Sequence, residues 1–106
     1  PKGPCMPDVV LTLVMPTDVA QQVEDLLLEH PELVSGFGTS LVDGHGSAVQ
    51  LVEPGELVSG HSPRVQIQTV GDPDRLQTML RVIREHYPHA NIFYWLAPTL
   101  EVGRII

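Results

Sequence analysis

Residues 9–15 read Val-Val-Leu-Thr-Leu-Val-Met, a short run rich in β-branched side chains that ends at Pro16. This composition and length predict a central strand that is buried on both faces. The next segment predicts a helix, because one face of it would carry Val19, Val23, Leu26, Leu27 and His30. Asp18 and Gln21 have the spacing of a capping box at the start of this helix, and Pro31 predicts its end.

The rest of the chain predicts three more strands and a second helix. Alternation indicates strands over residues 37–43 and 64–70, and an aromatic-rich segment indicates a last strand over residues 92–97. Asp72 as the cap and Pro73 as the first helical residue predict a helix between the last two strands. Its apolar stripe consists of Leu76, Met79, Leu80, Ile83 and Tyr87.

This order, β-α-β followed by a long loop and a second β-α-β, predicts the α+β class. The expected architecture is a ferredoxin-like βαββαβ sandwich, in which both helices cover one face of a four-stranded antiparallel sheet. The other face is then left bare, and it holds Val10, Val14, Phe93 and Trp95. An uncovered apolar face indicates an oligomer interface, and a cyclic assembly covers it together with an edge strand expected at residues 101–106.

Length and charge limit the classes of protein and partner. The 106 residues suit one domain, expected over residues 8–106, after a disordered tail or expression remnant at residues 1–7. Six basic and thirteen acidic residues give a net charge of −7, which argues against nucleic acid as a partner. There is no apolar run of about 18 residues, so we expect no membrane insertion. The single cysteine, Cys5, forms no internal disulfide and favours a cytoplasmic location.

The sequence contains no catalytic motif that we recognise. G-x-S-x-G, the Walker sequence and the dinucleotide-binding glycine pattern are all absent. A ferredoxin-like enzyme of the α+β barrel type is the rival interpretation, but the sequence offers no candidate acid–base residue for it. We therefore predict that the protein is not an enzyme.

The histidines fall into two groups. His30, His86 and His89 lie at predicted helix ends, where an imidazole favours the helix dipole and the free carbonyls. His45 and His61 instead lie beside glycines at the two borders of the long loop, residues 44–62. Because these borders return close together, the two imidazoles can share a divalent metal or an anion, or they can simply hydrogen-bond the loop.

Two arginines are the basic residues nearest to the loop and the tail, Arg64 and Arg104. A guanidinium beside the backbone amides of Gly44 and Gly46 suits a phosphate or a carboxylate. The alternative is an ion pair between each arginine and one of the thirteen acids.

Several short segments together resemble a small PII-like family of bacteria, whose genes often lie beside heavy-metal efflux pumps of the resistance–nodulation–division type. They are Ser35-Gly36-Phe37, Val42-Asp43-Gly44-His45-Gly46, Glu56-Leu57-Val58-Ser59-Gly60, Tyr94-Trp95 with Pro98, and Gly103-Arg104. The resemblance runs from Val9 to Arg104 and includes PII signalling proteins and CutA-like proteins as relatives.

The resemblance implies a homotrimeric regulator that senses a small ligand in the clefts between subunits, with a role in heavy-metal homeostasis. It implies a nucleotide-like anion or a divalent metal as the ligand, and an efflux pump or another protein as a partner that contacts loop 44–62. A metal-binding buffer or chaperone of the CutA-like kind is the alternative. The chain departs from PII proteins in the turn between the second helix and the last strand. This turn, residues 88–91, reads Pro-His-Ala-Asn and has no glycine or lysine to hold the phosphates of a nucleotide. The chain also has no tyrosine in the loop, and it has His61 where the family tends to have a basic residue.

Overall fold

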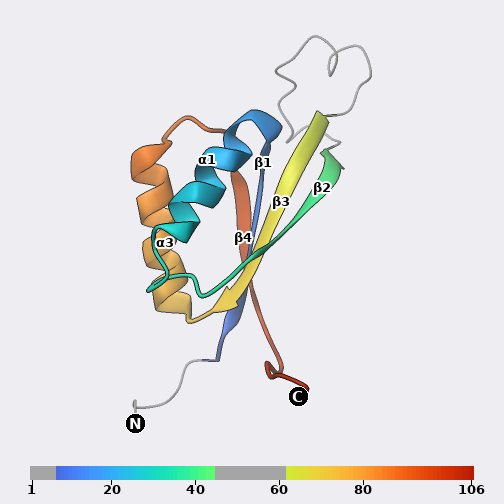
Figure 1. Ribbon diagram of the computed structural model, residues 1–106, viewed down its shortest axis with the longest axis vertical. Coiled ribbons are helices and arrows are strands. Elements are labelled where there is room, and N and C mark those ends of the chain that lie inside the picture. The colour runs from blue at the N-terminus through green and yellow to red at the C-terminus, as the bar shows by residue number, and fades with distance from the viewer. Residues whose placement is uncertain (1–6, 45–61) are drawn as a thin grey trace.

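In a computed structural model of the chain, which describes residues 7–44 and 62–106, two β-α-β units follow one another (Figure 1). Their elements are β1 (Val9–Pro16), α1 (Thr17–Leu28), β2 (Gly38–Gly44), β3 (Ser62–Gly71), α3 (Pro73–His86) and β4 (Phe93–Pro98). Residues 1–6 of the predicted tail and residues 45–61 of the predicted loop lie outside the described part. Within that part, no helix is long and apolar enough to cross a membrane.

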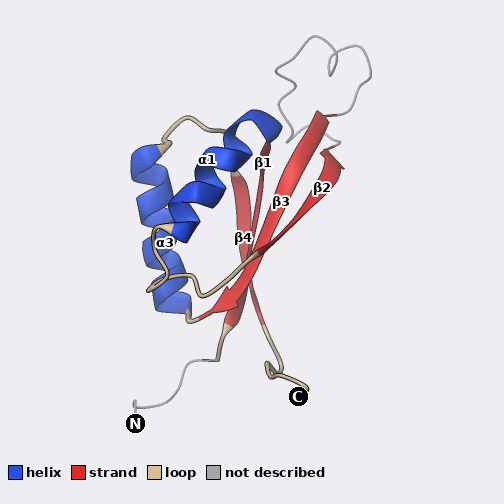
Figure 2. Ribbon diagram, viewed as in Figure 1, coloured by secondary structure: helices blue, strands red, loops and turns tan. Residues whose placement is uncertain are grey.

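The strands form one antiparallel sheet in the order β2-β3-β1-β4. Both helices lie against the same face of this sheet (Figure 2). The predicted α+β class and the ferredoxin-like arrangement are therefore confirmed. Strand β1 is central because it pairs with β3 on one side and with β4 on the other.

The core lies between β1 and the two helices. Leu11, Leu13 and Met15 alternate along β1 and are at most 1% exposed. They meet the apolar stripes of the helices, whose buried members are Ala20, Val23, Leu26, Leu27, Leu76, Met79, Leu80 and Ile83. The stripe predicted for α3 is thus correct in its first four positions, and Tyr87, its fifth, caps the helix and is half-buried.

The two helices begin in different ways. Asp72 caps α3, since its Oδ2 accepts the backbone N–H of Arg75 at 3.0 Å. The capping box predicted for α1 is wrong: Pro16 occupies the N-cap position, and no side chain caps the helix. β1 runs directly into the helix at Pro16, which leaves Asp18 in the first turn. Gln21 instead donates a hydrogen bond to Asp25 Oδ1 at 3.0 Å.

The tail after β4 forms no strand within the described residues, so the predicted edge strand at 101–106 is wrong for the single chain. The pairing of β4 with β1 ends where Pro98 meets Val9, the first residue of β1. Beyond that point β1 offers no further partner. Thr99 Oγ1 donates to Asp8 O at 2.7 Å, and the chain then leaves the sheet.

We expect the Asp72→Ala variant to lower the free energy of unfolding by about 1 kcal/mol, because it leaves the Arg75 N–H without its side-chain acceptor. Urea denaturation followed by circular dichroism measures this change. The matched variant Asp72→Asn keeps a capping oxygen and should stay close to the parent protein. Equal losses in both variants would show that the cap bond does not stabilise α3.

Candidate functional site

The two ends of the predicted loop meet at one end of the sheet. Strands β2 and β3 stay paired up to Gly44 and Ser62, which are opposite each other in the register. The expectation that the loop borders return close together is therefore confirmed at these two residues. His45, Gly46 and His61 lie outside the described residues, so their part in a site stays a prediction.

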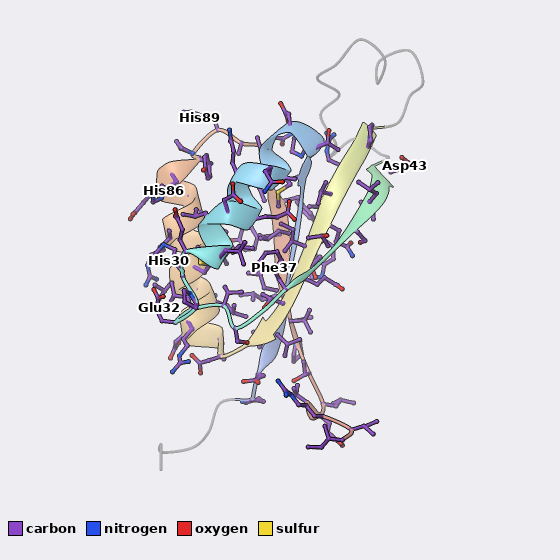
Figure 3. The ribbon with its side chains drawn as sticks, in the orientation of Figure 1. His30, Glu32, Phe37, Asp43, His86 and His89 are labelled. Carbon is purple, nitrogen blue, oxygen red and sulfur yellow. The ribbon has the colours of Figure 1, made fainter. Side chains whose placement is uncertain are left out.

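Arg64 lies at this base of the loop. It is opposite Val42 of β2 and Pro16 of β1, and only 4% of it is exposed. Its Nη1 donates to Pro63 O at 3.1 Å. Asp43 pairs with Pro63 on the neighbouring strand and is exposed (Figure 3). A buried guanidinium is stable only where it is hydrogen-bonded or paired, so the fold holds a fixed positive charge at this strand end.

Within one chain, Arg104 does not lie close to Arg64. It belongs to the exposed tail, which leaves the sheet at the end where Val9 meets Pro98. Arg64 is opposite Pro16, at the other end of β1. Seven residues of strand separate the two ends, or about 24 Å. Within the single chain, the two arginines are therefore not brought into one site.

The described histidines lie on the helical side of the molecule, away from the loop base (Figure 3). His86 Nδ1 donates to Val82 O at 2.9 Å, which confirms its predicted role at a helix end. His30 Nδ1 lies 3.0 Å from Glu32 Oε2 in the turn after α1. No group of three or more His, Cys, Asp or Glu residues within ranges 7–44 and 62–106 is arranged to hold a metal ion.

The face of the sheet opposite the helices is lined by apolar and aromatic side chains on β1 and β4, and by glutamines on β3. Val14 is opposite Phe93, Thr12 is opposite Trp95, and Val10 is opposite Ala97. We call this surface the open sheet face, and we define it by Val10, Thr12, Val14, Gln66, Gln68, Val70, Phe93, Trp95 and Ala97. Phe93 and Trp95 are 61% and 42% exposed, with ring centroids 5.8 Å apart. The predicted bare face is thus present.

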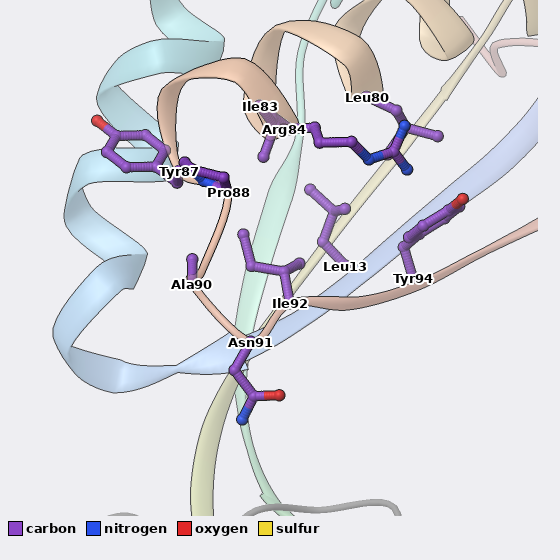
Figure 4. Close-up of a pocket in the computed structure, with 10 residues that line it drawn as sticks. All are labelled: Leu13, Leu80, Ile83, Arg84, Tyr87, Pro88, Ala90, Asn91, Ile92 and Tyr94. Carbon is purple, nitrogen blue, oxygen red and sulfur yellow. The ribbon is translucent and has the colours of Figure 1, made fainter.

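Two features of the structure were not expected from the sequence. Gln68 donates to Thr12 Oγ1 at 3.2 Å in the middle of the open sheet face, where Thr12 is fully buried. A cavity of about 220 Å³ also lies between the end of α3 and the start of β4 (Figure 4). Its lining residues come from α3, from the turn at 88–92 and from strands β1 and β4, and nothing in their spacing indicates a void.

The sheet order and the two helices on one face define a ferredoxin-like fold, which is similar to that of a solved PII-like protein. A family model described as "Protein of unknown function (DUF3240)" matches residues 5–106, and the chain belongs to this family. No curated protein sequence matches it.

Two solved structures are similar over almost their whole length. A DUF3240 family protein from Shewanella baltica OS155 has a TM-score of 0.76 and 19% identity, and the match covers 95% of this chain and 99% of that chain. CPII, a nitrogen regulatory PII-like protein from Thiomonas intermedia K12, was solved bound to ADP, AMP and bicarbonate. Its TM-score is 0.68 at 17% identity, over 95% of this chain and 98% of that chain. At these sequence identities, the similarity shows that the folds are alike and shows nothing further.

We expect the pKa of Glu32 to lie below 4.5, chiefly because the His30 side chain hydrogen-bonds its carboxylate. In His30→Ala this pKa should rise towards 4.5, since the partner is lost. Carboxyl carbon shifts followed by NMR during an acid titration measure both values. An unchanged pKa of Glu32 in the variant would mean that the hydrogen bond from His30 does not lower it.

Proposed function

We propose that the protein is a non-catalytic PII-like regulator that binds a small, nucleotide-like anion in the clefts between the subunits of a homotrimer. The observation that supports this most is the buried guanidinium of Arg64 at the loop base, two residues along β3 from Ser62, which is opposite Gly44. A fixed positive charge together with backbone amides recognises phosphate and carboxylate groups. CPII, which has a similar fold, was solved with ADP, AMP and bicarbonate, all of which are anions.

The open sheet face supports the proposed homotrimer. Two helices cover one face, and the other is left with half-exposed Phe93 and Trp95. Burial of this apolar surface stabilises an assembly by roughly 25 cal/mol per Å². A closed ring of three copies buries the same surface on every subunit without leaving a free edge for further growth. It also allows the tail of one copy, with Arg104, to approach the loop base of another.

The resemblance adds two finer proposals, a role in heavy-metal homeostasis and an efflux pump as the partner of loop 44–62. The alternative ligand is a divalent metal held by His45 and His61. The pH dependence separates the two ligands: protonation of the imidazoles below about pH 6.5 favours an anion but competes with a metal.

Calorimetry against ADP, AMP and bicarbonate tests the ligand proposal. We expect the parent protein to bind at least one of them, with higher affinity at pH 6 than at pH 8. Arg64→Lys, which keeps the charge but loses the planar fork, should weaken binding about tenfold, and Arg64→Gln should weaken it further.

Arg75→Gln is the matched control, because Arg75 is an exposed arginine at the start of α3. It should bind like the parent. Circular dichroism shows whether the Arg64 variants fold. Equal affinity in folded Arg64→Lys, Arg64→Gln and the parent would place the anion site elsewhere, and binding of zinc that weakens as the pH falls would favour the metal alternative.

Light scattering tests the assembly. We expect a mass near three times 11.6 kDa at micromolar concentration, and a lower mass for Trp95→Asp, because a charge buried in an apolar interface is strongly unfavourable. Leu28→Asp is the control: Leu28 is 69% exposed on α1, on the helical side of the sheet. This variant should assemble like the parent. A monomer mass for the parent protein would overturn the proposal.

A further inference from the structure

The cavity beside α3 lies on the helical face of the sheet, and so it is separate from the open sheet face. Leu13 of β1 forms part of its lining, and Tyr94 of β4 is directly opposite Leu13 in the register. Leu80 and Ile83 of α3 line it from the other side, and the turn at residues 88–92 closes one end (Figure 4).

The floor of the cavity is apolar and its rim is polar, with Arg84, Asn91 and Tyr94 among the lining residues. Leu13, Leu80 and Ile83 belong to the core and are at most 6% exposed, so their positions are set by packing. Asn91 holds the closing turn with a φ of 58°, a left-handed conformation that asparagine tolerates better than most residues. The volume of about 220 Å³ exceeds the roughly 150 Å³ of an engineered apolar cavity that takes up benzene. It therefore has room for one ring or one branched aliphatic group.

The mouth of the cavity carries a positive charge. Arg84 is exposed, and its guanidinium extends past Leu80 towards Tyr94 (Figure 4). Within residues 7–44 and 62–106, Arg84 forms no ion pair and no side-chain hydrogen bond. Arg81, one turn earlier, instead donates to Thr78 Oγ1 at 3.0 Å. In a chain with thirteen acids and six bases, an unpaired guanidinium beside an apolar cavity is an available anion partner.

We infer that this cavity binds a small organic carboxylate with a branched aliphatic or single-ring body. The body packs against Leu13, Leu80 and Ile83, and the carboxylate accepts paired hydrogen bonds from the Arg84 guanidinium. The Tyr94 hydroxyl, at the same mouth, is a second donor. This site differs from the one proposed at the loop base, which is at Arg64 and takes a nucleotide-like anion.

Calorimetry and ¹⁵N-correlated NMR on the full chain test this inference with four compounds. We expect 4-methylpentanoate and phenylacetate to bind and to shift the amide signals of Ile83, Ile92 and Tyr94. Two matched compounds should bind at least about tenfold more weakly: 4-methylpentanamide, which has the body without the charge, and acetate, which has the charge without the body.

Three variants assign the roles of the residues. Arg84→Gln should weaken 4-methylpentanoate about tenfold and leave 4-methylpentanamide unchanged, whereas Arg81→Gln should change neither. Ala90→Phe, which fills the cavity from its half-exposed rim, should abolish binding of all four compounds. Failure of the parent protein to bind either carboxylate at millimolar concentration overturns the inference, and so does equal binding by Arg84→Gln. Binding that is lost in Arg64→Gln but kept in Ala90→Phe assigns these carboxylates to the loop base and likewise overturns it.

Discussion

Strand β1 places one constraint on the whole structure: it is apolar on both faces, but the chain has helices for only one. Leu11, Leu13 and Met15 are buried beneath α1 and α3. The alternate residues Val10 and Val14 point to the opposite face, where Phe93 and Trp95 extend the apolar surface. Exposed apolar surface of this kind favours association in water. This imbalance is the reason that we propose a trimer whose subunits cover the surface.

The fold was predictable where the sequence has a long periodic pattern of apolar residues or a clear helix-capping signal. The β-branched run at 9–15 and the stripe on α3 are such patterns, and the Asp72-Pro73 start of α3 is a local signal that no distant contact overrides. The start of α1 was predicted wrongly because β1 runs directly into the helix through Pro16, whose φ of −59° already suits a helix start. The tail was also predicted wrongly, because an edge strand depends on how far β1 extends and not on the tail's own composition.

The candidate site was only partly predictable, for similar reasons. The meeting of the loop borders follows from the βαββαβ topology, and the register confirms it at Gly44 and Ser62. The separation of Arg64 from Arg104 depends on where β4 pairs along β1, which no local pattern encodes. The cavity beside Arg84 is a gap between residues that the sequence assigns to the core and to the outer surface of a helix. The Thr12–Gln68 hydrogen bond likewise joins residues 56 positions apart.

Trp95 gives the most direct test of the claim that the open sheet face is covered by other copies of the chain. It is the single tryptophan, and in the isolated chain 42% of it is exposed. Fluorescence at micromolar concentration should show the blue emission of a buried indole, protected from acrylamide quenching, and dilution should move the emission to the red as the assembly dissociates. A red emission that acrylamide quenches freely, and that does not change with protein concentration, would contradict the account.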